Sequence, residues 1–280
     1  MRQISVNQVR QAVRDLCIRQ SYLVPPDIEA CVHAAQASET SEQAKYVLGQ
    51  IIENHTIAAA EQMPLCQDTG MACVFIALGQ QVQLIDGDLY TAIHQGVREG
   101  YREGFLRKSI VQDPLVRQNT DDNTPAFIHV DIVPGDVVTI IVAAKGAGSE
   151  NMSRLAMLNP AAGRQGVIDF VLDTVRRAGA NPCPPIVVGV GIGGNFDTVA
   201  HLAKKAALRP LNIRHDSDVY VKLELELLDE INKLNIGSGG FGGKTTALGV
   251  NIETSATHIA ALPVAVNINC HVTRRESVTI

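Results

Sequence analysis

The sequence contains no tryptophan, and aromatic residues make up only 4% of its 280 positions. Apolar residues nevertheless account for 46% of the chain, so the core has to be built from Ala, Val, Ile and Leu. A chain of this length and apolar content can bury a substantial core, and it is globular rather than disordered.

Long apolar runs and basic stripes are also missing. The longest apolar stretches, such as VVTIIVAA and IVVGVGI, fall far short of the ~20 residues that span a bilayer. The N-terminal MRQISVNQVRQAVRDL has charges spaced through it, unlike a signal peptide. The net charge is −5, with no clustered Lys and Arg and no aromatic platform. We therefore expect a cytoplasmic protein that binds neither membrane nor nucleic acid.

Hydrophobic periodicity predicts an α/β or α+β fold with a helical N-terminal lobe followed by a mixed sheet with flanking helices. The lobe is expected at 1–62 and the α/β region at 63–280, as one continuous domain. Helices are expected at 5–20, 25–38, 40–62, 88–104, 164–178, 197–208 and 219–234. Strands are expected at 72–78, 127–132, 137–143, 186–190, 247–252 and 264–269. VPGD, at 133–136, is typical of a hairpin turn between the second and third of these strands.

Two glycine-rich stretches resemble nucleotide-binding loops without meeting their requirements. GVGIGG, at 189–194, fits the dinucleotide fingerprint, but LRPLNIRHDSD follows where an acid-terminated second strand is needed. GSGGFGGKTT, at 237–246, has Ser238 where a P-loop needs glycine, and a helix pattern precedes it. Glycines in this second stretch allow close backbone approach or an anion-binding nest.

The six cysteines fall into two groups. Cys17, Cys31 and Cys73 occupy apolar helix or strand patterns and are expected to be small buried hydrophobes. The remaining three lie at strand–loop junctions beside proline or glycine: Cys66, Cys183 and Cys270. Their spacing matches no zinc or ferredoxin pattern, so the residues alone leave open a shared metal site and ordinary buried thiols.

A resemblance to a known family narrows this choice. Five stretches, in order, resemble the iron–sulfur hydro-lyases, namely the class I fumarate hydratases and L(+)-tartrate dehydratases, and specifically the alpha subunit of the two-chain forms. These stretches are CQDTG, KGAGSEN, NPCPPIVVGVGIGG, ELLDEINKLNIGSGGFGGK and NINCHVTRR. They cover the chain from about residue 61 to its end. The resemblance implies a [4Fe–4S] cluster held by Cys66, Cys183 and Cys270, which leaves one iron without a protein ligand.

The same resemblance implies the site residues. Gln67, Asp68, Arg107 and Gly146 are expected to bind the substrate, with Asp68 and His258 in catalytic roles. An arginine can clamp a carboxylate through two parallel hydrogen bonds, and a carboxylate or an imidazole can move a proton. Simpler interpretations stay open: Asp68 as a turn residue before Gly70, His258 as a structural histidine, and Arg107 in a surface ion pair.

The implied reaction is the reversible hydration of fumarate to malate, a step of the tricarboxylic acid cycle. The alternative within the family is dehydration of L(+)-tartrate to oxaloacetate. Two alternatives lie outside this family: a dinucleotide-binding oxidoreductase and an electron-transfer iron–sulfur protein. The second would need a fourth protein ligand for its cluster. Single-chain members continue past the last cysteine, whereas this sequence ends ten residues after Cys270. We therefore expect a small dicarboxylate substrate, a separate beta subunit that closes the site, and a homodimer of alpha subunits within a heterotetramer.

Overall fold

The structure, a computed structural model, describes residues 1–280. Contacts divide the chain into two units. Unit 1 comprises Met1–Pro25, Asn54–Ala147 and Arg274–Ile280, and unit 2 comprises Pro26–Glu53 and Gly148–Thr273. Both units combine a mixed sheet with helices, so the predicted α/β or α+β class is confirmed. The N-terminal residues 1–62 are largely helical, and they are shared between the two units.

Unit 1 is built on a four-stranded sheet with the order β10-β5-β2-β4. Its strands are β2 (Met71–Gly79), β4 (Phe127–Val133), β5 (Val138–Lys145) and β10 (Arg275–Thr279). A two-stranded parallel sheet joins β1 (Arg2–Ser5) to β3 (Val82–Ile85). The helices α1 (Val6–Tyr22) and α4 (Leu89–Glu103) pack on each other and share one apolar core with β2 and β5.

The predicted hairpin between 127–132 and 137–143 is wrong. These strands exist as β4 and β5, but β2 lies between them, parallel to β4 and antiparallel to β5. The VPGD segment crosses the end of β2, where Gly79 N donates to Val137 O at 2.9 Å. The reason lies in β2 itself, whose residues 72–76 are all buried, as expected of a central strand rather than an edge strand.

Unit 2 is built on a second four-stranded sheet with the order β6-β9-β7-β8. Its strands are β6 (Arg154–Leu158), β7 (Ile186–Gly194), β8 (Ala247–Thr257) and β9 (Leu262–Asn269). Its helical elements are α2 (Pro26–Ser38), η1 (Pro160–Ala162), α6 (Gly163–Ala178), α7 (Phe196–Leu208), α8 (Asp218–Asn232) and η2 (Ser238–Gly240). Two helices cross the boundary between the units, α3 (Glu42–Glu61) and the short α5 (Ala147–Glu150).

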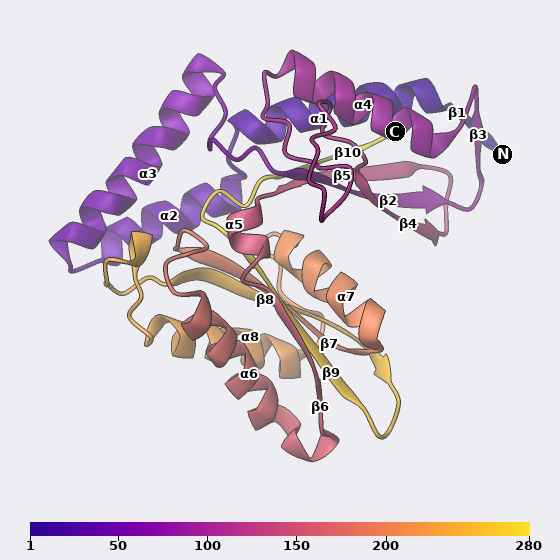
Figure 1. Cartoon of the computed structure of the whole chain (residues 1–280). Coiled ribbons are helices and arrows are strands. Elements are labelled where there is room, and N and C mark those ends of the chain that lie inside the picture. The colour runs from indigo at the N-terminus through magenta and orange to yellow at the C-terminus, as the bar shows by residue number, and fades with distance from the viewer. The chain divides into compact units, whose positions relative to one another are not determined.

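The two faces of β7 carry different residues, and this alternation explains its glycine pattern. Ile186, Val188, Val190 and Ile192 point into the core formed with α6 and α8. Gly189 and Gly191 face α7. Figure 1 shows α7 on the other side of this sheet from α6 and α8. A Cβ atom on Gly191 would stand 2.3 Å from Val199 O, and one on Gly189 would stand 2.2 Å from Ala203 O. The glycines therefore let the helix backbone lie directly on the strand.

This arrangement also accounts for the apparent dinucleotide fingerprint. All six residues of GVGIGG lie inside β7, so there is no glycine loop between a strand and a helix N-terminus to hold a pyrophosphate. The helix α7 begins with its own capping box, in which Asn195 Oδ1 accepts from Thr198 N at 3.0 Å. The pattern is thus a packing feature of the sheet.

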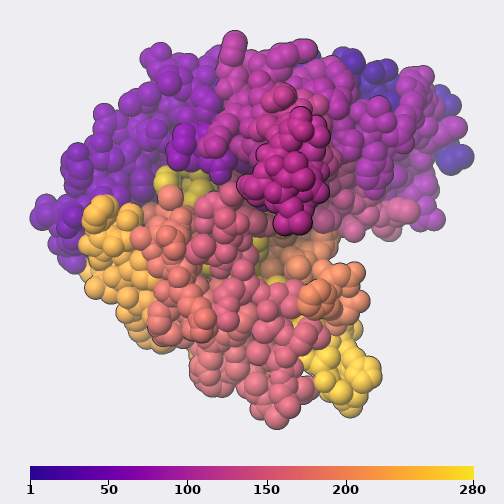
Figure 2. All heavy atoms as spheres, viewed as in Figure 1, coloured from indigo at the N-terminus to yellow at the C-terminus, as the bar shows by residue number.

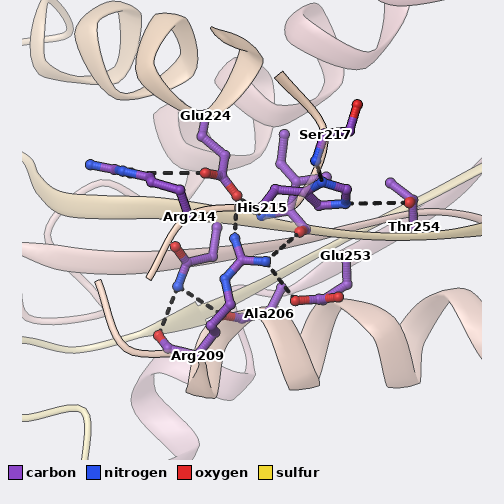
Figure 3. A network of polar contacts seen from close by, with 10 residues as sticks. Ala206, Arg209, Arg214, His215, Ser217, Glu224, Glu253 and Thr254 are labelled. Atoms are coloured by element: carbon purple, nitrogen blue, oxygen red, sulfur yellow. Dashed lines mark hydrogen bonds and ion pairs between the residues drawn. The ribbon is translucent and has the colours of Figure 1, made fainter. Parts of the chain in front are cut away.

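A buried charge network joins α7, α8 and β8 in unit 2 (Figure 3). The carboxylate of Glu224 on α8 has no exposed surface and accepts from Arg209 Nη2 and from Ile252 N. Arg209, which follows α7, also donates to Glu253 Oε1 at 2.7 Å. Removing one member of a buried pair leaves an uncompensated charge, at a cost of about 3–5 kcal/mol. The network therefore fixes the C-terminal end of α7 against the sheet.

None of the helices combines the length and the apolar character that crossing a bilayer requires.

We expect Gly191→Ala to lower the free energy of unfolding by at least about 1–3 kcal/mol, because the new methyl group would overlap the α7 backbone. The measurement is urea-induced unfolding. Gly49→Ala is the matched control, since a Cβ there meets only the flexible amide of Gln36, at 3.1 Å, inside a helix. The control should be neutral or stabilising by about 0.5–1 kcal/mol. Equal stability of the Gly191→Ala protein and the wild type would show that α7 can move away freely.

Candidate active site

The loop between α3 and β2 carries Cys66, Gln67 and Asp68 in unit 1. It has no regular secondary structure, yet Thr69 and Gly70 at its end are buried. Buried backbone groups without a ladder partner have to find other partners. Side chains from distant segments supply them here, which holds the loop in one conformation.

Three consecutive carbonyl groups of this loop each accept a side-chain hydrogen bond. Arg274 Nη1 donates to Asp68 O at 2.7 Å. The hydroxyl of Tyr101, a fully buried residue, lies 2.9 Å from Gly70 O and 3.2 Å from Thr69 O. Asn123 Nδ2 also donates to Gly70 O, at 3.2 Å. Burial raises the pKa of Tyr101 well above its usual value, so its hydroxyl keeps the proton that it donates.

The carboxylate of Asp68 bridges its own loop and the end of β5. Its Oδ1 accepts from Gly70 N at 3.0 Å, which forms the turn that the sequence allowed as a simpler role. Its Oδ2 accepts from Ala147 N at 3.0 Å. Gly146 lies beside that contact, and a Cβ atom there would be 3.3 Å from Asp68 Oδ2. Asp68 is therefore held in place by backbone N–H groups, with its Oδ2 beside Gly146.

Arg107 and Gln67 belong to the same region of unit 1. Thr69 Oγ1 donates to Arg107 O at 3.1 Å, so the backbone of Arg107 is tied to the Asp68 loop. The Arg107 side chain is exposed and makes no ion pair, so the surface-pair interpretation does not describe it. The exposed Gln67 accepts from the thiol of Cys66, at 3.3 Å between Sγ and Oε1. Unit 1 thus gathers Cys66, Gln67, Asp68, Arg107 and Gly146.

The other two junction cysteines lie together at one end of the unit 2 sheet. Cys183 comes three residues before β7 begins, and Cys270 directly follows β9. These strands are antiparallel neighbours in which Val187 pairs with Asn269, so both cysteines lie at the same edge. His271 Nδ1 is 3.1 Å from Cys183 O, a contact that joins the two loops.

The glycine-rich loop after α8 supports the Cys183 segment. Gly239 N donates to Pro184 O at 2.8 Å, and a Cβ on Gly240 would stand 2.3 Å from Ala180 Cβ. Lys244 N donates to Glu39 Oε2 at 2.7 Å. Because these N–H groups have partners inside the protein, the loop acts through close backbone packing and not as a phosphate-binding loop.

Glu39 anchors that loop from the end of α2. Burial by itself would raise the pKa of this carboxyl group, but hydrogen bonds from the backbone N–H groups of Ser41, Thr40, Lys244 and Thr245 outweigh burial and lower the pKa. Glu39 is 3% exposed and therefore stays ionised in a nearly closed site. Hydrogen bonds from these backbone amides stabilise the negative charge of Glu39.

His258 lies at the opposite end of the unit 2 sheet from Cys183 and Cys270. It directly follows β8, whose last residue, Thr257, pairs with Gly194 at the far end of β7. The nine residues of β7 separate the two ends by about 30 Å. Figure 2 shows the connection between β8 and β9, in yellow at the lower right, as a protruding end of unit 2. His258 is exposed there and its Nδ1 accepts from Ala260 N at 3.1 Å.

An iron–sulfur cluster held by three cysteines requires three accessible thiols. Cys183 is exposed, Cys66 and Cys270 are half-buried, and none of the six cysteines forms a disulfide. Cys17 and Cys73, by contrast, are buried in the core, and burial raises the pKa of Cys17 to about 12. Three soft ligands on irregular loops fit a cluster. Neither unit alone contains three or more His, Cys, Asp or Glu side chains placed to hold a metal ion.

Sequence reasoning missed the residues that hold the Asp68 loop. Tyr101 reads only as an apolar position of an amphipathic helix, and Asn123 as part of a polar loop. Arg274 lies within the NINCHVTRR motif, so the sequence did mark its position. Its hydrogen bond to the Asp68 loop could not be predicted, because the motif does not show which segment of unit 1 Arg274 contacts.

Comparisons with known proteins identify relatives along almost the whole chain. Residues 10–279 match the family model "Fumarate hydratase (Fumerase)". The chain is 42% identical to the "Putative L(+)-tartrate dehydratase subunit alpha" of Methanocaldococcus jannaschii, over 96% of this chain and 96% of that protein. It is 32% identical to the "L(+)-tartrate dehydratase subunit alpha" of Escherichia coli strain K12, over 100% of this chain and 93% of that protein.

Proposed function

The chain belongs to the fumarate hydratase (Fumerase) family and is a hydro-lyase, and we propose that it is the cluster-bearing alpha subunit of an iron–sulfur enzyme acting on a four-carbon dicarboxylate. The observation that carries this proposal is the gathering of Asp68, Arg107 and Gly146 beside Cys66. Cys66 and Asp68 share one loop, the Asp68 carboxylate accepts from Ala147 N next to Gly146, and Thr69 of the same loop donates to the backbone carbonyl of Arg107.

In this proposal Cys66, Cys183 and Cys270 hold a [4Fe–4S] cluster. Three ligands for four irons leave an open coordination position, which supplies Lewis-acid polarisation of the substrate hydroxyl and carboxylate. The accessible loop positions of these thiols support the assignment, as does the contact between the Cys183 and Cys270 segments.

The protein side chains would bind and orient the substrate. Arg107 can clamp a carboxylate through two parallel charge-assisted hydrogen bonds, because its guanidinium has no other partner. Gln67 offers an amide, and the backbone of Gly146 lies beside the Asp68 carboxylate. Asp68, fixed by two backbone N–H groups, would take or return the proton of the hydroxyl oxygen during addition or loss of water.

Two substrates fit this chemistry. Hydration of fumarate adds a hydroxyl to one carbon of the double bond and a hydrogen to the other, which gives malate, and with fumarate the chain would serve the tricarboxylic acid cycle. Dehydration of L(+)-tartrate removes one hydroxyl and a hydrogen from the adjacent carbon, and the product rearranges to oxaloacetate. We propose fumarate as the substrate from the sequence motifs. The names of the relatives favour L(+)-tartrate as the second candidate.

A separate beta subunit is part of the proposal. The relatives are named as alpha subunits, and this chain covers at least 93% of their length. The candidate site exposes Arg107 and Gln67 to solvent, whereas catalysis on a diacid benefits from a closed and oriented site. A beta subunit would supply the opposite wall and the group that moves the carbon-bound proton.

The position of His258 supports a second copy of this chain in the assembly. A side chain about 30 Å from the Cys183–Cys270 edge of its own sheet cannot reach a cluster bound there. If His258 contacts the substrate, it has to do so at the site of another alpha subunit. A twofold pair of alpha subunits would exchange this residue reciprocally and, with two beta subunits, would form the expected heterotetramer.

We expect Cys66→Ser, Cys183→Ser and Cys270→Ser each to abolish the visible iron–sulfur absorption, because a hydroxyl is a poor replacement for a thiolate ligand. Cys31→Ser and Cys73→Ser are the controls and should keep their iron. The measurement is iron per chain after anaerobic reconstitution, together with the absorption spectrum. A full complement of iron in Cys183→Ser would overturn the cluster assignment.

The reaction is tested by assaying the anaerobically reconstituted chain with and without the beta subunit on fumarate and on L(+)-tartrate. We expect the complex to turn over one of them, and the isolated chain to be nearly inert because half of the site is missing. The ratio of kcat/KM for the two substrates decides between the candidates. Full turnover by the isolated chain would contradict the need for a partner.

The exchange of His258 is tested by complementation between Asp68→Asn and His258→Asn chains, each inactive as a pure assembly. The two chains are co-expressed with different tags, and purification through both tags isolates the mixed pair. If His258 acts in the other subunit's site, this pair holds one doubly altered site and one intact site. We expect this mixed assembly to recover about half of the wild-type activity. No recovery, with both chains loaded with iron, would overturn the exchange of His258 between two alpha subunits.

A further inference from the structure

Arg274 is a buried arginine without a counter-ion. Its residue is 3% exposed, and it lies where the chain re-enters unit 1, one residue before β10. Nη1 donates to Asp68 O at 2.7 Å, which is the only hydrogen bond of the guanidinium within the chain. Nε is buried and has no partner. No carboxylate forms an ion pair with this side chain.

This state is unusual for a guanidinium. Arginine presents five N–H donors and keeps its charge at every physiological pH. A charge taken out of water is normally paired, and a buried donor without a partner loses the hydrogen bond that water would have given it. A neutral donor would be enough to hold one carbonyl group. The unused charge therefore points to an anion that binds Arg274 from outside the chain.

The neighbours of Gly146 show which group lies beside Arg274. A Cβ atom placed on Gly146 would have Asp68 Oδ2 at 3.3 Å and Arg274 Nη2 at 3.6 Å as its two nearest neighbours. The acceptor Asp68 Oδ2 and the cationic donor Arg274 Nη2 therefore lie near each other, on the same side of the Gly146 backbone. All three residues belong to unit 1.

The pairing of acceptor and donor matches a 2-hydroxy acid. Such a molecule carries a hydroxyl, which can donate, and a carboxylate, which accepts, on neighbouring carbon atoms. Asp68 Oδ2 can receive the hydroxyl hydrogen while Arg274 Nη2 donates to the carboxylate. Charge-assisted hydrogen bonds of this kind are about twice as strong as neutral ones.

We infer that Arg274 binds the carboxylate next to the hydroxyl-bearing carbon of the substrate, and so sets that hydroxyl against Asp68. The inference rests on the proposed function. It assigns Arg274 to one carboxylate of the diacid and leaves Arg107 for the other. Arg274 thereby joins substrate binding to the position of Asp68, because the same guanidinium holds the Asp68 backbone.

The test is steady-state kinetics of the reconstituted complex with Arg274→Gln and Arg274→Lys. Losing one hydrogen bond to a charged group should raise KM roughly tenfold to a hundredfold in Arg274→Gln. Arg274→Lys keeps the charge but not the planar geometry and should give an intermediate KM. Glu276→Gln, which removes the exposed 2.7 Å ion pair with Arg19 from the same strand, is the matched control and should keep the wild-type KM.

A purely structural role gives a different result. If Arg274 only anchors the loop, both variants lower the melting temperature and leave KM unchanged in the fraction that folds, and that outcome overturns the inference. Arg274→Lys keeps the test usable if Arg274→Gln does not fold.

A binding measurement separates this inference from the proposed function. Succinate is a four-carbon diacid that cannot be hydrated, and butyrate lacks its second carboxylate. Succinate, and not butyrate, should raise the melting temperature of the wild-type complex and of Glu276→Gln, should raise that of Arg274→Lys less, and should leave that of Arg274→Gln unchanged. If the wild type is inactive but still shows this pattern, the proposed reaction is wrong and the carboxylate-binding role of Arg274 is supported. An active wild type with equal succinate shifts in all variants would sink the Arg274 assignment alone.

Discussion

The candidate site depends on how the backbone of residues 68–70 is satisfied. This segment is neither helix nor strand, and a buried irregular backbone is stable only when side chains replace the missing ladder partners. Tyr101, Asn123 and Arg274 donate to its three successive carbonyl groups from a helix, a loop and the start of a strand. Because each donor belongs to a different element, the loop can keep its shape only when unit 1 is fully assembled. The geometry of the candidate site therefore depends on the folding of unit 1.

In unit 2 the corresponding constraint is backbone packing without side chains. A chain with few aromatic residues has to fill its core with small groups, and here the glycine face of β7 meets the alanine-rich α7. The opposite face of the same strand is fully aliphatic. The buried Arg209–Glu224 pair then fixes the end of α7. Both edges of this sheet carry candidate site residues, so the rigidity of β7 sets the separation between His258 and the cysteine edge.

The sequence predicted the elements that its periodicity determines. The helices of residues 1–62 and the strands β2, β7, β8 and β9 carry strong local patterns, and the family followed from five motifs. The pairing of strands was less accessible: β4 and β5 have a good turn between them, but the choice of β2 as their common neighbour depends on burial of β2 from both faces. Short strands such as β6 and β10 were not recognised, because four or five residues hold too little periodicity.

Some residues of the candidate site could be identified from local sequence motifs, and others only from the structure. Asp68, Gly146 and Arg107 were identified by motif, and their proximity within unit 1 agrees with a shared site. Sequence could not show that His258 lies at the far end of its sheet, since a residue twelve positions before Cys270 can turn back or run the length of a strand. Arg274 could not be identified from its neighbours along the chain, because its role comes from a contact with Asp68 about two hundred positions away.

The path of the chain through β5 and β10 makes most of unit 2 an insertion. These two strands are adjacent and antiparallel, with Ala143 opposite Arg275, and the chain between them leaves unit 1 after Ala147 and returns at Arg274. In topological terms they are the two arms of a hairpin whose loop has grown into residues 148–273. Shortening that loop to a tight turn would leave the unit 1 sheet complete and the Asp68–Arg274 contact in place. Asp68, the candidate proton-transfer residue, thus belongs to the host fold, whereas two of the three candidate cluster ligands, Cys183 and Cys270, belong to the insertion.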